Sequence, residues 1–319
     1  MPQVLITMPV DDVGIQLLRA HPGWTLDLVQ SPTPEEFACR LEQADAVILR
    51  YQPLQRSAIE RAPKLKFVAR HGVGYDSVDL DALNERRIPL AITVNANASS
   101  VAEHAFSLLL AVARRTLAGD QSVRCGRWQM GVTMPLMELA GKTALVVGAG
   151  RIGCAMAQRL HAFDVTVSIY DPELPLDAPL PEGLERVVDL NAALARSDIV
   201  SLHLPLTHKT HHLINPLVCK KGAILINTAR GPVVSEALLI EALSSGHLGG
   251  AGLDVFEQEP LMASSALAEL PQVVLSPHIA ALTDAALRRM SSECAHNIID
   301  FFGGQVNRGA VINPQVLSS

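Results

Sequence analysis

The sequence predicts an α/β protein built from two domains, each with a parallel sheet. Short apolar runs alternate along the chain with longer segments of helical period, as expected where helices cover both faces of parallel strands. The chain has 319 residues, which is more than one compact core usually fills. Hydrophobic residues make up 49% of it and charged residues 18%, so the chain has enough apolar material to bury two sheets.

The predicted strands fall into two groups, one on each side of a helix over residues 99–113 that is apolar nearly all round. A second helix begins at about Thr283 and could return the chain to the first group. Between 114 and 135 no clear period is present, so an arm is expected there. The first group comprises 4–6, 46–49, 65–69 and 90–94, and the second comprises 143–147, 165–170, 199–204, 223–226, 251–256 and 273–275.

This order predicts a discontinuous outer domain and a continuous inner domain. The outer domain takes residues 1–99 plus 287–319, and the inner domain takes 100–286. The first break between them falls at the start of the apolar helix, which must be buried on several sides, between domains or between subunits.

Composition excludes several classes of function. The net charge of -6 and the pI near 6.0 leave no basic stripe for nucleic acid, so a small-molecule partner is expected. No apolar run reaches the roughly 18 residues of a membrane span, and the N-terminus lacks the pattern of a signal peptide, so a cytoplasmic protein is predicted. Five cysteines without a Cys-x-x-Cys pair favour free thiols. No metal site is predicted, although four histidines cluster at 203, 208, 211 and 212.

A glycine motif, GAGRIG, follows a predicted buried strand directly and opens a helix. Gly148 permits a tight turn, Gly150 lets a pyrophosphate approach the backbone, and Gly153 lets the helix pack on the strand. The amides at the helix start, those of Arg151 and Ile152, would donate to the phosphates. The order of strand, glycine turn and helix predicts a dinucleotide site.

Asp171 ends the next predicted strand, eighteen residues beyond Gly153. A carboxylate at this place accepts hydrogen bonds from ribose hydroxyls and would repel a 2′-phosphate, which favours NAD over NADP. The alternative is a turn residue before Pro172. With the surrounding strands and helix, the inner domain is predicted to bind NAD.

Three polar side chains lie just past three predicted strands of the inner domain: Arg230, Glu259 and His278. Parallel strands deliver such residues to one crevice at their carboxyl ends. A guanidinium can fix an anionic substrate, and an imidazole paired with a carboxylate can move a proton on and off oxygen. We predict these three as the catalytic residues. The alternatives are an ion pair at a strand end, a solvated carboxylate and a structural histidine.

Six motifs occur in one order along the chain: HGVGYD at 71–76, GAGRIG at 148–153, HLPLT at 203–207, NTARG at 227–231, GLDVFEQEP at 252–260 and SPHIA at 276–280. Through them the chain resembles the D-isomer-specific 2-hydroxyacid dehydrogenase family over nearly its whole length. That resemblance implies two Rossmann-like or flavodoxin-like domains with the substrate cleft between them, a homodimer, NAD(H) as cofactor, and catalytic roles for Arg230, Glu259 and His278.

The resemblance also implies binding contacts. Asp254 would bind the nicotinamide carboxamide, and Thr228 and Ala229 would line that end of the cofactor. The substrate carboxylate would lie against the backbone near Val73 and Gly74, where exposed amides can form an anion nest.

Two arginines of the outer domain bear on the choice of substrate. Arg50 and Arg70 end neighbouring predicted strands and could face a second anionic group, as in phosphoglycerate-type members of the family. They could equally be solvated strand-end charges. On the apolar helix, His104 is expected to hydrogen-bond to another helix.

The leading hypothesis is an NAD-dependent dehydrogenase that interconverts a small D-2-hydroxy acid and its 2-keto acid, of the hydroxypyruvate/glyoxylate or 3-phosphoglycerate type. A formate dehydrogenase is disfavoured, because formate enzymes of the family carry glutamine where Glu259 stands. The alternative is a dinucleotide-sensing, co-repressor-like binding protein. The three predicted catalytic residues argue against it, because a sensor needs no proton donor.

Overall fold

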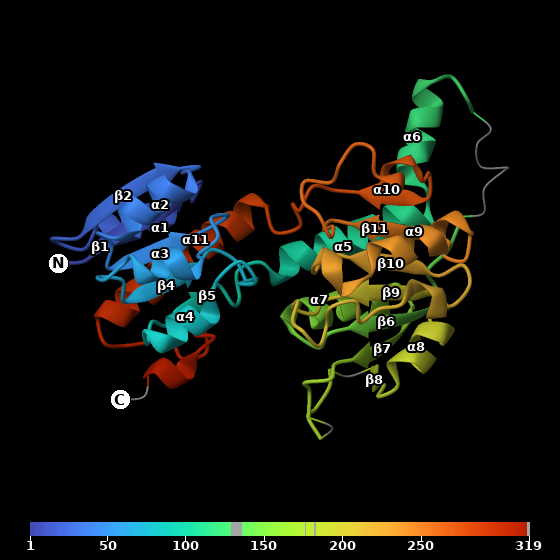
Figure 1. Ribbon diagram of the computed structural model, residues 1–319. Helices are drawn as coiled ribbons and strands as arrows, with labels where there is room; N and C mark the ends of the chain where they lie inside the picture. Colours follow the sequence, from blue (N-terminus) through green and yellow to red (C-terminus); the bar gives the residue numbers. More distant parts are fainter. Residues whose placement is uncertain (129–135, 176, 182, 318–319) are drawn as a thin grey trace. The chain divides into compact units, whose positions relative to one another are not determined.

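A computed structural model describes residues 1–128, 136–175, 177–181 and 183–317 (Figure 1). The chain divides into two compact units, Met1–Asn97 with Ala281–Ser319 and Ala98–Ala280. These boundaries lie two and six residues from those that the sequence suggests. Among the described residues, every helix is too short or too polar to cross a membrane.

The first unit contains a five-stranded sheet in the order β2-β1-β3-β4-β5, in which every strand pair is parallel. Residues of β3 alternate between two apolar clusters, Ala46 and Ile48 in one, Val47 and Leu49 in the other. Both faces of the sheet are therefore buried, which explains the uninterrupted apolar runs. The strands are β1 (Gln3–Met8), β2 (Thr25–Gln30), β3 (Ala46–Leu49), β4 (Phe67–Arg70) and β5 (Leu90–Ile92).

Helices cover both faces of this first sheet. Apolar residues of α1 and α11 belong to one cluster, and those of α2, α3 and α4 belong to the other. Helix α11 begins where the sequence predicts, and Thr283 caps it by accepting a hydrogen bond from the amide of Ala286 at 3.2 Å. The helices are α1 (Asp12–Arg19), α2 (Pro34–Leu41), α3 (Arg56–Glu60), α4 (Leu80–Glu85), α11 (Asp284–Phe302) and the 3₁₀ helix η4 (Pro314–Leu317).

The second unit contains a seven-stranded parallel sheet in the order β12-β11-β10-β9-β6-β7-β8. Counted from β6, this is the 3-2-1-4-5-6 order of a Rossmann sheet with one further strand. The strands are β6 (Thr143–Val147), β7 (Thr166–Tyr170), β8 (Leu184–Arg186), β9 (Ile199–Leu202), β10 (Ile224–Asn227), β11 (Gly250–Leu253) and β12 (Val273–Leu275).

Helices again lie on both faces, α5 and α7 on one and α8, α9 and α10 on the other. The long helix α5 packs closely on β11, where a Cβ added to Gly252 would lie 2.8 Å from Cβ of Leu108. The helices are α5 (Ala98–Ala113), α6 (Thr116–Arg124), α7 (Arg151–His161), α8 (Leu190–Arg196), α9 (Glu236–Ser244) and α10 (Ala266–Glu269), with the 3₁₀ helices η2 (Pro216–Val218) and η3 (Gly231–Val233).

Three elements differ from the sequence-based expectation. Strands β2 and β8 carry no apolar run, because each lies at the edge of its sheet and keeps exposed polar residues. The segment expected to be an irregular arm contains the helix α6, and its residues 129–135 lie outside the described part of the chain.

Candidate active site

The carboxyl ends of β10, β11 and β12 meet at one edge of the second sheet. Asn227 pairs with Leu253 in register, and Leu253 pairs with Leu275. The residues that follow each strand therefore start level with one another. This register explains why residues distant in the sequence come together.

His278 and Glu259 form a direct pair. The Nδ1 atom of His278 lies 2.7 Å from Oε2 of Glu259, and the two side chains are 49% and 37% exposed. The other carboxylate oxygen, Oε1, accepts the amide of Phe256 at 3.1 Å. The imidazole is thus oriented by a carboxylate that is itself held by the backbone.

Charges around Glu259 keep it ionised. Burial alone would raise the pKa of Glu259, but the hydrogen bond and charge of His278, the amide of Phe256 and the charge of Arg230 outweigh it and lower the pKa. The guanidinium of Arg230 therefore acts electrostatically on the same carboxylate that orients the imidazole. Its Nη1 atom also donates to the carbonyl of Ala229 at 2.6 Å. All three predicted catalytic side chains belong to this one edge of the sheet.

Asp254 holds the turn that carries His278. Its carbonyl accepts the amide of His278 at 2.9 Å, Oδ1 accepts the amide of Ile279 at 3.0 Å, and Oδ2 accepts the amide of Ala280 at 2.8 Å. His278 itself has a φ of 54°, in the left-handed region that non-glycine residues rarely adopt. These three bonds hold the unusual backbone conformation in place.

The Asp254 carboxylate is fully buried yet ionised. Burial alone would raise its pKa, but hydrogen bonds from His104, Ser276 and the amides of Ile279 and Ala280 lower it. The side chain is 1% exposed. The contact with the nicotinamide carboxamide that the resemblance implies stays a prediction, and the observed contacts give Asp254 a structural role as well.

Two polar residues at this edge were missed or misplaced by sequence reasoning. Ser276 donates to Oδ1 of Asp254 at 2.5 Å, and no signal beyond its place in the SPHIA motif pointed to it. His104 was expected to bond to another helix, and this is wrong: its Nε2 atom lies 2.8 Å from Oγ of Ser276, in the loop after β12. The apolar character of α5 concealed a partner that lies 172 residues further along the chain.

The glycine turn after β6 has the shape that a dinucleotide needs. Gly148 has a φ of 110°, and a Cβ added to Gly153 would lie 1.9 Å from the carbonyl oxygen of Gly148. An added Cβ at Gly150 meets nothing within 4 Å. The turn is therefore open at Gly150, and directly after it Arg151 and Ile152 begin α7 without a side-chain cap. The first amides of this helix remain available for phosphate oxygens.

One further observation fits a dinucleotide at this edge. The buried hydroxyl of Thr228 has no hydrogen-bond partner among the described residues, and it directly follows β10. The neighbouring amide of Ala229 is turned back, since it donates to Oδ1 of Asn227 at 3.0 Å. A buried hydroxyl without a partner is unusual, and a polar group of a ligand bound at the end of β10 would supply its hydrogen bond.

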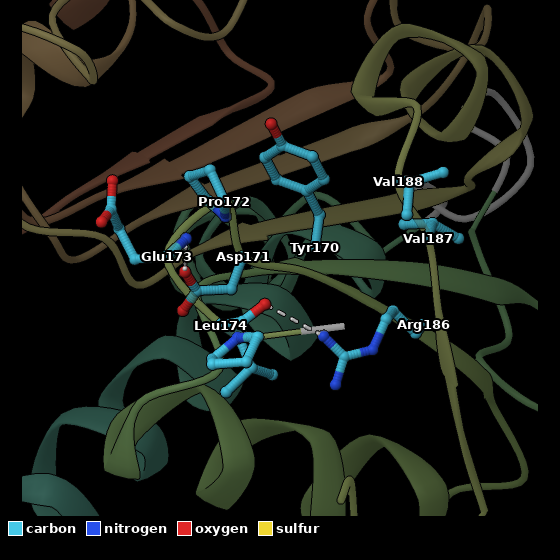
Figure 2. A pocket seen from close by; sticks show the side chains of 9 residues that line it. Tyr170, Asp171, Pro172, Glu173, Leu174, Arg186, Val187 and Val188 are labelled. Carbon is cyan, nitrogen blue, oxygen red and sulfur yellow. Dashed lines mark hydrogen bonds between the residues drawn. The ribbon is translucent and has the colours of Figure 1, made fainter. Parts of the chain in front are cut away.

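Asp171 lies at a pocket beyond β7 and β8, with a volume of about 390 Å³ (Figure 2). Its Oδ2 atom accepts the amide of Ala149 in the glycine turn at 2.8 Å, and Oδ1 accepts the amide of Glu173 at 3.0 Å. Arg186 donates to the carbonyl of Leu174 at 3.3 Å across this pocket. The pocket therefore combines apolar walls with two carboxylates, Asp171 and Glu173, and the guanidinium of Arg186, and such polar groups beside apolar walls suit a nucleoside. Its lining residues are Tyr170, Asp171, Pro172, Glu173, Leu174, Pro175, Arg186, Val187 and Val188.

In the first unit, Arg50 and Arg70 hold backbone carbonyls at the ends of β3 and β4. Arg50 is 8% exposed, donates through Nη1 to the carbonyl of Pro9 and lies over the Tyr51 ring, 4.8 Å from its centroid. Arg70 donates through Nε to the carbonyl of Gly74 at 2.8 Å and through Nη1 to that of Leu49 at 3.1 Å. Both guanidiniums therefore have a structural use.

The turn after β4 carries the predicted anion nest. Gly72 has a φ of 140°, and its carbonyl accepts the amide of Thr93. For the amides of Val73 and Gly74 no acceptor is found among residues that the structure describes. These two amides are thus available to an anion, which fits the expected place of the substrate carboxylate.

A buried histidine adjoins this nest. His71 is 4% exposed, and its Nε2 atom has no partner in the described part of the chain. Burial, with the charges of Arg50 and Arg70, lowers the pKa of His71 to about 4. The imidazole is therefore neutral at neutral pH.

The fold and these contacts together define the class of protein. A Rossmann sheet with an open glycine turn binds a dinucleotide, and a carboxylate-bound imidazole at the same edge handles a proton, so the class is a dinucleotide-dependent oxidoreductase. The comparisons then give the family. The chain belongs to the D-isomer specific 2-hydroxyacid dehydrogenases: the model of that family's NAD binding domain matches residues 106–280.

Three relatives show how far the similarity extends. The chain is 38% identical to a glyoxylate reductase of Thermofilum pendens, over 99% of this chain and 96% of that one. It is 35% identical to a D-3-phosphoglycerate dehydrogenase of Archaeoglobus fulgidus, over 98% of this chain but only 60% of that longer protein. The structure of a D-lactate dehydrogenase from Aquifex aeolicus, complexed with NAD and lactic acid, superposes with a TM-score of 0.85 at 30% identity, covering 97% and 98% of the two chains. The predicted fold class, family, dehydrogenase activity and NAD cofactor are confirmed.

Proposed function

We propose that the chain reduces a small 2-keto acid carrying a single carboxylate, of the glyoxylate or hydroxypyruvate kind, to the D-2-hydroxy acid, and catalyses the reverse oxidation. The 2.7 Å contact between His278 and Glu259 carries this proposal, because a sensor that only binds a dinucleotide does not need an imidazole paired with a carboxylate. The similarity to a glyoxylate reductase over nearly the whole chain supports the substrate class.

NAD would be held by the residues that the geometry favours. The amides of Arg151 and Ile152 would donate to the phosphates beside Gly150, and Asp171 would accept hydrogen bonds from the ribose hydroxyls. The Thr228 hydroxyl would gain a partner at the nicotinamide end. When bound, the reduced cofactor supplies a hydride to the substrate carbonyl carbon.

The protein's own residues manage the charge that hydride transfer creates. Arg230 binds the substrate carboxylate and polarises the keto oxygen with its planar donors. As negative charge develops on that oxygen, His278 donates a proton through Nε2, since Nδ1 is held by Glu259. The Glu259 carboxylate stabilises the imidazolium and fixes its orientation. In the oxidation direction His278 accepts the proton from the hydroxyl.

The amides of Val73 and Gly74 would bind the substrate carboxylate in the first unit. Arg70 supports this by holding the Gly74 carbonyl, while Arg50 holds the carbonyl of Pro9. Because these guanidiniums already bind backbone oxygens, we favour substrates with one carboxylate over phosphorylated ones.

The proposal extends to assembly and location. We expect a homodimer in the cytoplasm. Helix α6 and the residues after it expose apolar side chains, among them Leu117, Val123 and Trp128, the last 83% exposed, and a partner subunit would cover them. Light scattering on the purified chain checks this, and a monomer at micromolar concentration would contradict it.

A keto-acid panel tests the function directly. The purified full chain is assayed with NADH on glyoxylate, hydroxypyruvate, pyruvate and phosphohydroxypyruvate, and we expect the largest kcat/KM on one of the first two. His278→Ala should lower kcat by about 10²- to 10⁴-fold while the Kd for NADH stays within about threefold. His208→Ala, in an exposed loop, is the matched control. No oxidation of NADH on any substrate would reject the dehydrogenase and favour the sensor.

A further inference from the structure

A chain of polar contacts links helix α5 to the turn that carries His278. The Nε2 atom of His104 lies 2.8 Å from Oγ of Ser276, which lies 2.5 Å from Oδ1 of Asp254. Asp254 in turn accepts the amides of Ile279 and Ala280 with its two carboxylate oxygens. His104 is thus the outermost member of a relay that ends one residue from His278.

The directions of these hydrogen bonds follow from the donors present. An ionised carboxylate only accepts, so the single hydroxyl proton of Ser276 points to Asp254. The serine oxygen can then accept only from His104, whose Nε2 must carry a proton. The 3.4 Å separation between Nε2 of His104 and Oδ1 of Asp254 adds a direct attraction whenever the imidazole is charged.

The Asp254 carboxylate needs this support because it is fully buried. Inside the protein a carboxylate is costly unless its oxygens are satisfied. Two of its donors are the very amides that fix the turn after His278, and a third is the hydroxyl of Ser276, which His104 supports from behind with its Nε2 atom 3.4 Å from Oδ1. Loss of the side-chain donors would leave Oδ1 with one amide, so the carboxylate and the turn would shift together.

We propose that His104 is a positioning residue for catalysis, which acts through Ser276 and Asp254 to hold the backbone of His278 in its left-handed conformation. This inference rests on the proposed function, because it assigns His104 to the same reaction. His104 does not touch the substrate. It sets the place from which the His278 ring reaches both Glu259 and the substrate oxygen.

Substitution of His104 tests the relay. His104→Leu removes the donor and should lower kcat by about 10- to 100-fold, because a small displacement of a reacting group costs that much. The Kd for NADH should stay within about threefold. His104→Gln, whose amide donates from nearly the place of Nε2, should restore kcat to within about threefold of the original chain. Glu103→Gln, which changes the adjacent exposed residue, is the control and should have no effect on kcat.

A double-mutant cycle separates a relay from two independent effects. In a relay, Ser276→Ala with His104→Leu lowers kcat no further than the stronger single substitution, within about twofold. A kcat of the double variant that falls by the product of the two single losses would overturn the proposal. So would an unchanged kcat in His104→Leu, or failure of His104→Gln to restore kcat. If His104→Leu does not fold, the test uses Ser276. Ser276→Ala should lower kcat, and Ser276→Thr should retain the hydroxyl bond to Asp254 and keep kcat within about threefold of the original chain.

A crystal structure of the folded variant keeps this test separate from the proposed function. The rate of the unsubstituted chain, measured in the same assay, reports on the dehydrogenase reaction alone. In His104→Leu the turn at 278–280 should be displaced and the contact between His278 and Glu259 lengthened. An unmoved turn would overturn the positioning role even if the chain proved inactive on every keto acid.

Discussion

The turn after β4 and the turn after β12 occupy equivalent places, each at the carboxyl end of a parallel strand, and each carries a histidine. His71 in the first is 4% exposed and adjoins two arginines, and its pKa falls to about 4. His278 in the second is 49% exposed and bonded to Glu259. A position at a strand end therefore does not by itself fit a histidine to transfer protons. The exposure of the imidazole and the sign of the neighbouring charges determine whether it is suited to that role.

The backbones of the two turns differ as well. His71 continues its sheet, since its amide donates to the carbonyl of Leu49 at 2.8 Å. His278 instead adopts a positive φ that Asp254 holds in place. In the first turn the amide of Gly72 donates to the carbonyl of Arg70 at 2.9 Å, and the amides of Val73 and Gly74 have no acceptor among the described residues. In the second turn the amides of Ile279 and Ala280 donate to the Asp254 carboxylate. The first turn thus leaves two amides without an acceptor in the described chain, whereas the second uses its amides to hold its own backbone.

The largest effect is expected at Glu259, because this carboxylate is what distinguishes the surroundings of His278 from those of His71. Glu259→Gln replaces the partner of His278 by a neutral group, so the imidazolium loses its stabilising charge, and kcat for glyoxylate reduction should fall by about 100- to 1,000-fold. Stopped-flow or steady-state measurement of NADH oxidation checks this. Glu257→Gln is the control, because it breaks a similar pair two residues away, with His212 at 2.8 Å. Equal losses of kcat in Glu259→Gln and Glu257→Gln would contradict a catalytic role for the pair of Glu259 and His278.

A smaller effect, on stability, is expected at the β4 turn. The folded pKa of His71 is about 4 against an unfolded value of 6.5, so the unfolded chain binds more protons between these values and stability is lost as the pH falls through that window. From pH 7 to pH 4 the group should account for a loss of about 3 kcal/mol. Urea unfolding at both pH values checks this. His71→Gln should show a shallower pH dependence, whereas exposed His208→Gln should follow the original chain. An identical pH dependence in all three would show that His71 is not buried neutral.

The smallest effect is expected at Arg70. Arg70→Ala removes the bonds to the carbonyls of Gly74 and Leu49 and should loosen the anion nest, raising KM for glyoxylate and for phosphohydroxypyruvate alike by about three- to tenfold. Arg70→Lys serves as the conservative control. A rise in KM confined to the phosphorylated substrate would show instead that Arg70 binds a second anionic group.

Much of this site could be predicted from the sequence, because the strands of a buried parallel sheet appear as continuous apolar runs and their ends mark where the site residues begin. Each of the three predicted catalytic residues follows a predicted strand, and the register of β10, β11 and β12 brings those strand ends level. The strands β2 and β8 were missed for the converse reason: edge strands keep polar residues and carry no such run.

The remaining features depend on contacts that no local pattern encodes. The partner of His104 lies 172 residues away, and the lowered pKa of His71 depends on its burial and on the charges of arginines at the ends of two strands. The role of Asp254 in holding the His278 turn emerges only once three amides are seen to converge on it. Such features depend on tertiary packing, whereas the glycine turn and the strand ends depend on local backbone rules.

The proton-handling residues and the dinucleotide turn all lie within one unbroken stretch, Ala98–Ala280, whereas the anion nest belongs to the segment before it. In the proposed function, proton transfer therefore depends on residues of one unit, and the predicted anion nest belongs to the other. Combinatorial libraries confined to residues 1–97 would change the predicted anion nest and its surroundings while leaving Arg230, Glu259 and His278 unchanged.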